Sequence, residues 1–491
     1  MGFNYGIAFL SAVLKQRGHE TALINLNEKL GFPLDPGRIR NEIEAFQPDL
    51  IGFSIVTNQY NVARDVARTI REHVSVPLVA GGVHVTMDPQ AVLADGLFDY
   101  ACVGEGESAL ADLADALEKG EPTDAIPNIW KRSDGEVVAN AVRPFEDLAD
   151  LPIKDYELFD FQKLIDAKDG WVGLMTSRGC IFRCSYCFNH RMVETYSRET
   201  GLSTSELRYT RHHPVDHVIS EIEHLLKNYS GIDVFIFDDD LFTFDREYVE
   251  EFCRRYRETT DVRFVVNGHV KVFDAEIAQL LKDAGCWMVK FGVESGSDRV
   301  RRDVMNRHMT NEEIAGAFEV ARDAGLETSA FVMFGLPHET REDILDTIKL
   351  LARIVPDRIR WAIFFPYPHT KAFEIARDAG MIDFDKMERL SNFMDASCLD
   401  FGDEHNLFIE KLQKTFPWWV NAYLDSEAAE FYAGQVELVE GLSPGEFVHL
   451  EPHFRNADSM FSQQMSGLGR PHYTIKYNDF MAVLCQKTCN H

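Results

Sequence analysis

The stretch VGLMTSRGCIFRCSYC, residues 172–187, runs from an apolar strand pattern directly into three closely spaced cysteines. Cys180, Cys184 and Cys187 fall within eight positions, although the chain of 491 residues has only nine cysteines. That spacing is typical of metal ligands and not of a disulfide framework. Because a [4Fe–4S] cluster accepts four ligands, a loop with three leaves one iron open to another molecule. Two alternatives stay open: a zinc site with His190 nearby, or incidental buried thiols.

From this stretch onward, strand patterns alternate with helical patterns in six steps over about 200 residues. Strands that alternate with helices of this length predict a parallel sheet. Six steps predict a partial (β/α)6 barrel, since a complete barrel needs eight. The helices are expected near 214–228, 245–257, 274–285, 311–324 and 340–353.

A second alternating series precedes the barrel, so an α/β fold is predicted for both parts. An amphipathic helix opens at Gly6, and the patterns after it predict a doubly wound, Rossmann-like sheet. No strand precedes Gly6, so we expect either that the sheet lacks its central first strand or that this sequence is trimmed at its start. Ligands of such sheets bind beyond the carboxyl ends of the strands. The strand patterns are TALINL at 21–26, LIGFSIV at 50–56, PLVAGG at 77–82 and DYACVG at 99–104.

Composition and pattern divide the chain into four parts. The Rossmann-like domain is expected over 1–125, a linker with a Ser-Asp-Gly turn at 133–135 over 126–164, and the barrel over 165–380. The remaining 381–491 are expected to be irregular and mostly helical, and to cap the substrate cavity. Six aromatic residues of that last part are predicted to be core: Phe416, Trp418, Trp419, Tyr423, Phe431 and Tyr432.

The charge balance argues against nucleic acid as a partner. Fifty basic and 79 acidic residues give a formal net charge of -29, which repels phosphate backbones over most of the surface. Hydrophobic residues make up 45% of the chain, enough for several cores. No apolar run approaches the ~18 residues of a membrane span, and the start lacks a signal-peptide pattern, so we expect a cytoplasmic protein.

The spacing C-x3-C-x2-C, with Tyr186 before the last cysteine, resembles the signature of the radical S-adenosylmethionine (SAM) superfamily. The resemblance implies that Cys180, Cys184 and Cys187 hold a [4Fe–4S] cluster whose open iron binds the amino and carboxylate groups of SAM. It also implies reductive cleavage of SAM to a 5′-deoxyadenosyl radical, which abstracts hydrogen from the substrate. The resemblance covers about 165–380 and includes TSRG at 176–179, FDDD at 237–240, GVESG at 292–296 and FGLP at 334–337.

The same resemblance assigns further residues to SAM. Asp239 is expected near the methionyl amine, and Glu294 and Ser295 near the ribose or the methionyl part. Gly335 is expected near the adenine. Alternatives are that at least one carboxylate of 238–240 caps the next helix, and that the turn at Gly335 makes no contact.

Four other positions are also expected near the barrel mouth. Gly292 and Gly296 would let the backbone approach SAM closely. Asn267 and His269 follow a strand pattern, where a general acid or base is one interpretation. A histidine satisfied by local hydrogen bonds is the other.

The part in front of the barrel resembles the cobalamin-binding domain of the B12-dependent radical SAM class. A large flat corrin needs small residues where the loops of a sheet meet it, although a nucleotide would fit the same residues. The D-x-H-x-x-G loop that supplies a cobalt ligand in some B12 proteins is absent from this sequence, and His84 does not replace it. The resemblance assigns five residues to cobalamin: Ser54, Gly81, Gly82, Gly104 and Gly106.

Four cysteines outside the loop are interpreted by their surroundings. Cys102, Cys253 and Cys286 lie beside apolar residues and are predicted to be core. Cys398 follows the barrel at a position that would line the substrate cavity, where a catalytic thiol is one interpretation.

Two features near the end of the chain are less specific. His369 stands where the family often has the glycine of P-Y-P-G-T, so it is either a turn variant or a substrate contact. Cys485, Cys489 and His491 lack further ligands and are interpreted as a plain tail rather than a metal site.

The resemblance implies methyl transfer to an unactivated carbon or phosphinate centre of a small molecule, such as a natural-product or lipid precursor. One alternative is a B12-dependent oxidative cyclisation resembling that of the anaerobic Mg-protoporphyrin IX monomethyl ester cyclase. Another is a non-catalytic relative that binds cobalamin or a cluster. A cluster of this kind also implies oxygen sensitivity, and a low-potential electron donor such as flavodoxin or ferredoxin.

Overall fold

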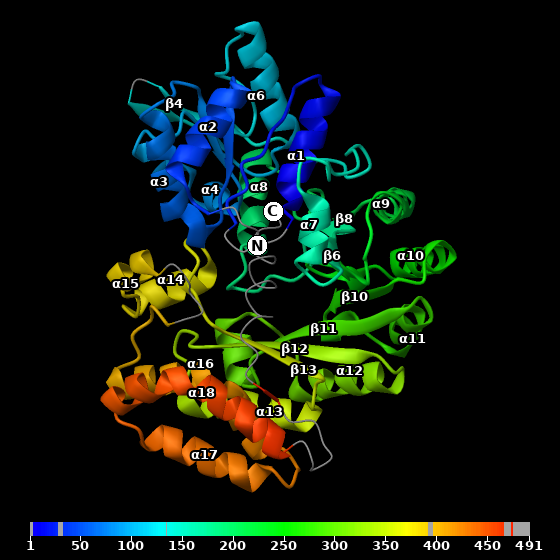
Figure 1. Ribbon diagram of the computed structural model, residues 1–491, viewed down its shortest axis with the longest axis vertical. Helices are drawn as coiled ribbons and strands as arrows, with labels where there is room; N and C mark the ends of the chain where they lie inside the picture. The colour runs from blue at the N-terminus through cyan, green and yellow to red at the C-terminus, as the bar shows by residue number, and fades with distance from the viewer. Residues whose placement is uncertain (1–2, 28–32, 134, 391–395, 466–472, 475–491) are drawn as a thin grey trace.

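The front part of the chain, the barrel and the carboxyl-terminal helices follow one another along the long axis of the molecule (Figure 1). The computed structural model is α/β up to residue 363 and helical beyond it, apart from one isolated bridge. It describes all residues except 1–2, 28–32, 134, 391–395, 466–472 and 475–491.

The front sheet has five strands: β1 (Ile51–Ser54), β2 (Leu78–Gly81), β3 (Tyr100–Cys102), β4 (Ile129–Ser133) and β5 (Glu136–Val138). They lie side by side in that order. The first three are parallel, whereas β4 and β5 add to β3 as an antiparallel hairpin. The helices of this part are α1 (Tyr5–Gln16), α2 (Pro36–Phe46), α3 (Tyr60–Arg71), α4 (Val83–Met87), α5 (Pro89–Ala94) and α6 (Glu107–Lys119), with a 3-10 turn at Thr57–Gln59.

Two features of the front sheet differ from the sequence prediction. TALINL at 21–26 is not a strand, and the described residues contain no strand before β1. In a doubly wound sheet this segment would pair with the central first strand, which the described residues do not supply. The sheet also continues past residue 125 into the expected linker, because Gly135, at a φ of 86°, allows the tight turn between β4 and β5.

The barrel sheet consists of β6 (Trp171–Leu174), β9 (Val234–Phe237), β10 (Arg263–Gly268), β11 (Cys286–Glu294), β12 (Glu327–Phe334) and β13 (Arg358–Ile363). All six strands are parallel, and each lies beside the next along the chain. The predicted six-stranded partial barrel is therefore confirmed. Its outer helices are α9 (Val215–Asn228), α10 (Arg246–Thr259), α11 (Ala275–Asp283), α12 (Asn311–Asp323) and α13 (Arg341–Ile354).

Local sequence fixes where these helices begin. The hydroxyl groups of Thr310 and Thr340 cap α12 and α13, and Glu313 and Asp343 complete a capping box at each. The carboxylate of Asp245 caps α10. Each helix therefore starts at a fixed point after its strand, which places the loops between them at the carboxyl edge of the sheet.

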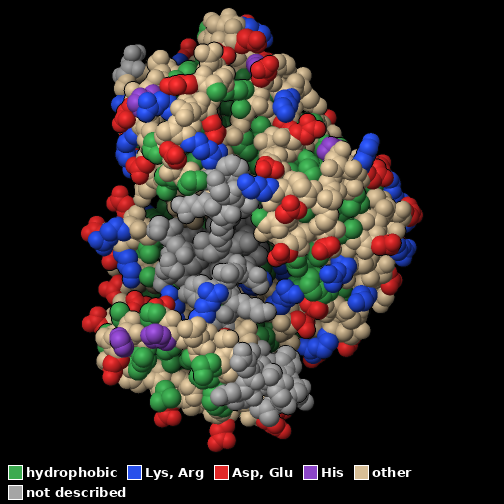
Figure 2. Space-filling view, viewed as in Figure 1, with side chains coloured by type: hydrophobic (Ala, Val, Ile, Leu, Met, Phe, Trp, Pro, Cys, Tyr) green, Lys and Arg blue, Asp and Glu red, His purple; other side chains and the backbone are tan. Residues whose placement is uncertain are grey.

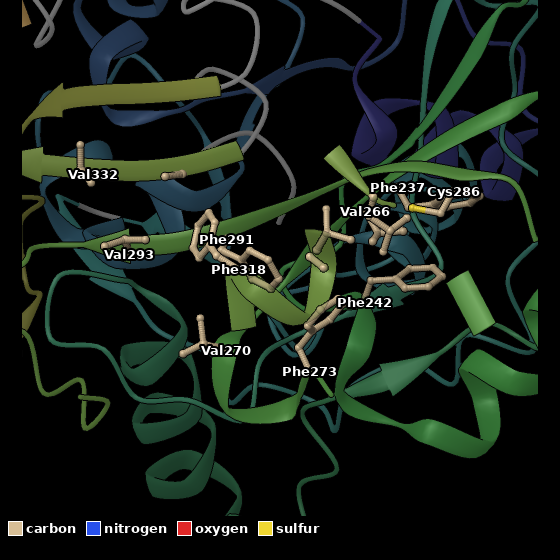
Figure 3. Close-up of a cluster of buried hydrophobic side chains, with 14 of the residues drawn as sticks. Phe237, Phe242, Val266, Val270, Phe273, Cys286, Phe291, Val293, Phe318 and Val332 are labelled. Carbon is tan, nitrogen blue, oxygen red and sulfur yellow. The ribbon is translucent and has the colours of Figure 1, made fainter. Parts of the chain in front are cut away.

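The barrel strands bury a continuous apolar layer against these helices. Phe237, Phe291 and Phe318 are fully buried in it, and Figure 3 shows them among their neighbours. Full burial of one such side chain contributes about 1.5–3 kcal/mol to folding. Cys253 and Cys286 belong to the same cluster, so their predicted core positions are confirmed.

Shorter elements connect the two sheets and the barrel loops. A two-stranded ribbon of β7 and β8 follows the first barrel strand. The bounds are α7 (Phe161–Asp166), β7 (Ser177–Arg178), α8 (Asn189–Thr200), β8 (Arg211–His212), η3 (Phe242–Phe244), η4 (Val270–Val272) and a π-helical turn, η5 (Val300–Val304).

The carboxyl-terminal helices are α14 (Lys371–Asp378), α15 (Phe384–Arg389), α16 (Asp403–Tyr423), α17 (Ala429–Gly441) and α18 (Pro444–Met465). α16 packs on α13 and β13, where Phe416 stacks on Phe334 and Trp361 with ring centroids 5.5 Å apart in each pair. Four of the six aromatic residues predicted to be core are buried, and Phe431 is partly buried. Tyr423 is 46% exposed at the end of α16, so that prediction was wrong.

The surface carries charges of both signs. Figure 2 shows Lys and Arg interspersed with Asp and Glu over the described part of one face. Among the helices that the structure describes, none is both long enough and apolar enough to span a membrane.

Candidate functional site

The three cysteines share one loop between β7 and α8. Cys184 is buried, Cys180 and Cys187 are half-buried, and all three thiols are free. Burial, together with the nearby carboxylate of Asp240, raises the pKa of Cys180 to about 12 and that of Cys187 well above its usual value. Thiolates at these positions therefore need bound cations, which the iron of a cluster provides. The loop fits the predicted ligand set.

The segment after the π-helical turn braces this loop. The Ser185 hydroxyl donates to the carbonyl of Val304 (2.5 Å), and its amide donates to the carbonyl of Met305 (3.0 Å). The Asn306 side chain donates to the carbonyl of Arg183 (2.7 Å). The loop conformation is therefore fixed by backbone and side-chain hydrogen bonds from a distant segment.

Arg307 is a site residue that the sequence interpretation missed. Its Nη1 donates to the sulfur of Cys184 (3.3 Å), and its Nη2 donates to the carbonyl of Gly292 (2.5 Å). The charged side chain is buried, and its two contacts join the cysteine loop to the end of β11. A buried arginine cannot be told from an exposed one by local sequence, because its burial depends on tertiary partners.

His190 does not complete a zinc site. Its Nδ1 lies 3.1 Å from the carbonyl of Cys184 and 2.5 Å from that of Cys187, so the ring hydrogen-bonds to the backbone of the loop. Within the described ranges, no group of three or more His, Cys, Asp or Glu side chains is arranged to hold a single metal ion. The geometry gives His190 a structural part in the loop.

His269 packs against the cysteine loop. Its ring stacks on Phe182 with centroids 3.7 Å apart, and its Nδ1 accepts from the amide of Lys271 (3.2 Å). Burial, assisted by Arg307, lowers the pKa of His269 to about 2. The neutral, stacked ring favours the satisfied histidine over a general acid. Asn267 donates to the backbone carbonyl of residue 239 (2.7 Å).

Asp239 holds the strand that leads into the cysteine loop. Its Oδ1 accepts from the amide and hydroxyl of Thr176 (2.9 and 2.8 Å) and from the hydroxyl of Ser177 (2.5 Å). Its Oδ2 is buried and has no hydrogen-bond partner among the described residues. Burial raises the pKa of Asp239 to about 6. One carboxylate oxygen is thus left for a bound donor.

The expectation that a carboxylate of 238–240 caps the next helix is wrong. Asp245 caps α10, because the short turn η3 lies between the strand and the helix. Asp238 instead accepts from the Tyr5 hydroxyl (3.1 Å) and lies 3.6 Å from the Nζ of Lys290. Asp240 accepts from the side chain of Asn189 (3.1 Å).

Glu294 ends β11 in a strained conformation. Its φ of 66° lies in the left-handed region, where non-glycine residues are rare outside functional sites and turns. A Cβ atom on Gly292 would lie 2.4 Å from the Oε1 of Glu294, so glycine at 292 makes room for the carboxylate. The structure therefore presents Glu294 beside Arg307 and the cysteine loop.

The next two residues face α13. The Ser295 hydroxyl lies 3.4 Å from the hydroxyl of Thr347 and accepts from the amide of Ser297 (3.2 Å). A Cβ atom on Gly296 would lie 2.4 Å from the carbonyl of Asp346. Packing against α13 accounts for both residues, and the SAM contact of Ser295 stays a prediction.

The carboxylate of Glu339 stabilises the turn at Gly335. Glu339 Oε2 accepts from the amides of Gly335 (2.6 Å) and Leu336 (3.1 Å). Glu339 Oε1 is buried without a partner among the described residues, and burial raises its pKa to about 8. Gly335 itself has a φ of 78°, which explains glycine at this position.

The carboxyl edge of the front sheet carries the five small residues assigned to cobalamin. Ser54 is exposed at the end of β1, and Gly81 lies opposite it at the end of β2. A Cβ atom on Gly81 would make only ordinary contacts, so close packing does not require glycine at this position. Such an edge fits a large flat ring in size.

Two of the four glycines in this set also have packing reasons. A Cβ atom on Gly82 would lie 2.7 Å from the carbonyl of Ile55, and one on Gly104 would lie 1.9 Å from the hydroxyl of Tyr196. Both residues have positive φ, of 97° and 87°. A Cβ atom on Gly106 would lie 3.3 Å from Cys102 Sγ. Their contact with cobalamin stays a prediction.

Two histidines meet where the front domain touches the barrel. His84 is buried, its ring is tilted by 39° against that of Tyr60 with centroids 4.2 Å apart, and burial lowers its pKa to about 4. His369 has a φ of 65°, and its Nε2 lies 3.3 Å from an oxygen of Asp88. The glycine-like backbone favours the turn variant over a substrate contact for His369.

The remaining cysteines that the structure describes give no second site. Cys102 belongs to the core of the front sheet, as predicted. Cys398 is buried in a small apolar cluster with Ala362 and Phe365, and burial raises its pKa to about 12, which disfavours a reactive thiolate. Cys485, Cys489 and His491 lie outside the described residues.

Comparison with known proteins identifies both parts of the chain. Residues 174–351 match the radical SAM superfamily, and residues 2–114 match the B12 binding domain. An uncharacterized methyltransferase of Pyrococcus horikoshii is 31% identical over 379 residues, which cover 76% of this chain and 78% of the relative. The anaerobic magnesium-protoporphyrin IX monomethyl ester cyclase of Rubrivivax gelatinosus is 27% identical over 410 residues, which cover 81% and 70%.

A solved structure confirms the architecture. OxsB, a cobalamin-dependent SAM radical enzyme with aqua-cobalamin and SAM bound, superposes with a TM-score of 0.68 at 15% identity. The match covers 99% of this chain and 76% of that one, so the fold is shared across the front sheet, the barrel and the helices. The chain therefore belongs to the radical SAM enzymes that carry an amino-terminal B12-binding domain and use a [4Fe–4S] cluster, SAM and cobalamin.

Proposed function

We propose that the chain methylates an unactivated carbon or phosphinate centre of a small molecule, such as a natural-product or lipid precursor. One observation carries the proposal. Glu105, at the carboxyl edge of the front sheet, pairs with Arg178 (3.0 Å), which stands two residues before Cys180. The loop at the edge that would bind cobalamin is therefore in direct contact with the strand that leads into the loop that would bind the cluster. The similarity to a methyltransferase supports methyl transfer as the reaction.

The working parts follow from this arrangement. We assign cobalamin to 1–125, the cluster and SAM to 165–380, and the cover of the substrate cavity to 381–491. The connection, 126–164, includes the hairpin of β4 and β5 that completes the front sheet. Cys180, Cys184 and Cys187 would hold the cluster. SAM would lie against Asp239, Glu294, Ser295 and Gly335, and cobalamin against Ser54, Gly81, Gly82, Gly104 and Gly106.

Methyl transfer of this kind uses two molecules of SAM, one as the source of the radical and one as the methyl donor. When bound, the reduced cluster would supply the electron for the cleavage of one SAM, and cobalamin would carry the methyl group of a second SAM, which would leave as S-adenosylhomocysteine. The protein binds the cofactors and SAM and orients them. The unpartnered Oδ2 of Asp239 would accept from the SAM ammonium, and Glu294 would face SAM from the end of β11.

An electron donor is part of the proposal. A [4Fe–4S] cluster of low potential needs a reductant such as flavodoxin or ferredoxin, and we propose that the chain receives the electron in the cytoplasm. Ile181, between two of the cysteines, is 50% exposed, so the loop itself reaches the surface. A donor could therefore approach the cluster at this loop.

A second candidate function is oxidative cyclisation. The similarity to the Rubrivivax cyclase over 81% of this chain favours it. The two reactions differ in what they make from SAM, because only methyl transfer releases S-adenosylhomocysteine.

The test is to reconstitute the chain anaerobically with iron, sulfide and hydroxocobalamin, reduce it with titanium(III) citrate and add SAM. Methyl transfer predicts both 5′-deoxyadenosine and S-adenosylhomocysteine, with the latter dependent on cobalamin. Deoxyadenosine without S-adenosylhomocysteine in the cobalamin-loaded protein would contradict the proposal in favour of the cyclase reaction.

A further inference from the structure

Two carboxylates of the front domain and two guanidinium groups of the barrel form a buried ionic network. Glu105 lies 3.0 Å from Arg178 and 2.6 Å from Arg211, and Glu107 lies 2.5 Å from Arg178. All four side chains are between 5% and 12% exposed. Because buried charges are costly unless paired, a balanced set of two acids and two bases is a specific arrangement and not a surface accident.

The network joins the two places where cofactors are expected. Glu105 stands between Gly104 and Gly106, in the loop that follows β3 at the carboxyl edge of the front sheet. Arg178 ends β7, two residues before Cys180, and Arg211 begins β8, which pairs with β7. A shift of the front domain would therefore pull on the strand that enters the cluster loop.

The helix that follows the cysteines, α8, makes a second contact with the loop that contains Glu105. The hydroxyl of Tyr196, on α8, accepts from the amide of Glu105 (3.1 Å) and fills the space left by the absent side chain of Gly104. Phe145 stacks on Tyr196 with centroids 3.8 Å apart, and the guanidinium of Arg211 lies over Phe145 (4.7 Å). The strand before the cysteines and the helix after them thus hold one loop of the front domain.

The remaining hydrogen-bonding capacity of Glu105 is also used. Its Oε2 accepts from the amide of Glu146 (2.7 Å), and Arg211 donates to the carbonyl of Glu146 (2.7 Å). Although burial raises the pKa of Glu105, Arg211 and Arg178 lower it more, to about 2. The carboxylate is therefore charged at neutral pH, and the two-point contact of Arg211 fixes its orientation as well as its position.

We propose that Glu105, Glu107, Arg178 and Arg211 are positioning residues that set the distance between cobalamin and the cluster, and so couple the two uses of SAM. The proposal rests on the proposed function. Buried ion pairs contribute little net stability compared with apolar packing, but they specify one geometry. In a reaction that needs two cofactors at a fixed separation, that geometry determines the rate.

The test compares Glu105→Gln with wild type after anaerobic loading with iron, sulfide and hydroxocobalamin. Glutamine keeps the size and the acceptor for the amide of Glu146 but removes the charge that faces both arginines. Iron and cobalamin contents are measured first. The reduced cluster is paramagnetic and speeds the electron spin relaxation of cob(II)alamin, so that relaxation rate reports their separation. We expect slower relaxation and a ratio of S-adenosylhomocysteine to deoxyadenosine that is lower by at least about 10-fold.

Two further variants keep the proposal falsifiable. Arg211→Lys retains the charge but loses the two-pronged contact, and it serves as the test if Glu105→Gln loses cobalamin or unfolds. We expect it to change both readouts in the same direction, but less. Asp65→Asn removes an exposed ion pair with Arg68 in the same domain and should change neither readout.

The outcomes separate this inference from the proposed function. If a fully loaded Glu105→Gln or Arg211→Lys protein shows wild-type relaxation and a wild-type product ratio, the residues are merely structural and the inference is wrong. If the wild type binds both cofactors but releases no S-adenosylhomocysteine, the proposed function fails. The relaxation rate then still decides whether the network positions the two cofactors.

Discussion

The two cofactor regions of this enzyme are built by different means. The cysteine loop is fixed by side chains from distant segments, such as Asn306 on the carbonyl of Arg183 and Arg307 on the sulfur of Cys184. The edge of the front sheet presents small residues, such as Ser54 and Gly81. The barrel therefore fixes the geometry of the cluster ligands with its own side chains. The front edge leaves room for a large ligand, and its position depends on contacts with the barrel.

The largest effect expected on the barrel side concerns Glu339. Its pKa is raised from 4.5 to about 8, so the folded state favours the protonated acid. This contribution to stability is fully present below pH 4.5 and is lost as the pH rises through 8, by up to about 5 kcal/mol. Glu339→Gln should remove that part of the pH dependence. Denaturant unfolding of the cofactor-free chain at pH 5 and pH 8 measures it, and an unchanged dependence in the variant would contradict the assignment.

A smaller stability effect should separate two glycines of the front domain. Gly104→Ala places a Cβ atom 1.9 Å from the Tyr196 hydroxyl at a φ of 87°, and should cost about 2–4 kcal/mol. Gly120→Ala also has a positive φ, of 64°, but meets no atom within 4 Å, and should cost about 1–2 kcal/mol. Equal costs, measured by denaturant unfolding, would mean that contact with the barrel does not constrain Gly104.

The next effect tests preorganisation in the barrel. Asp239→Asn weakens the hold on Thr176 and Ser177 and removes the carboxylate expected to face SAM, so deoxyadenosine formation should fall by about 10–100-fold at unchanged iron content. Asp216→Asn, at an exposed ion pair on α9, is the matched control and should retain the wild-type rate. A wild-type rate in Asp239→Asn would remove Asp239 from the site.

The smallest effect is expected where the two domains touch at His369. His369→Gly relieves a left-handed backbone conformation and loses one partly exposed contact with Asp88, so the free energy of unfolding should change by less than about 1 kcal/mol. The deoxyadenosine rate should not change. A large loss of activity at unchanged stability would restore the substrate-contact interpretation of His369.

The sequence predicted those features that depend on local pattern. Six barrel strands, their five helices and the three-cysteine loop follow from periodicity and spacing, and all of them are present. TALINL at 21–26 has a strand pattern but is not a strand, because a strand also needs a neighbour. The pattern of a segment does not show whether its partner exists.

Site residues that act through tertiary contacts could not be predicted from the sequence. Arg307 and the pair Glu105 and Arg178 resemble ordinary surface charges in the chain, and only the folded structure buries them against one another. Gly82 and Gly104 were assigned to cobalamin alone, whereas the structure adds close packing as a reason for each. A glycine in the sequence does not show which neighbour requires it.

The most direct test of the account compares wild type with Cys184→Ala and Cys102→Ala after anaerobic reconstitution. The measured quantities are iron, sulfide and cobalamin per chain, and deoxyadenosine formed from SAM under reduction. We predict about four iron per chain in wild type and in Cys102→Ala, a buried thiol of the front sheet, with loss of iron and deoxyadenosine in Cys184→Ala alone. Deoxyadenosine formation that persists without Cys184, or a wild type that holds no cluster, would contradict the assignment of the cysteine loop.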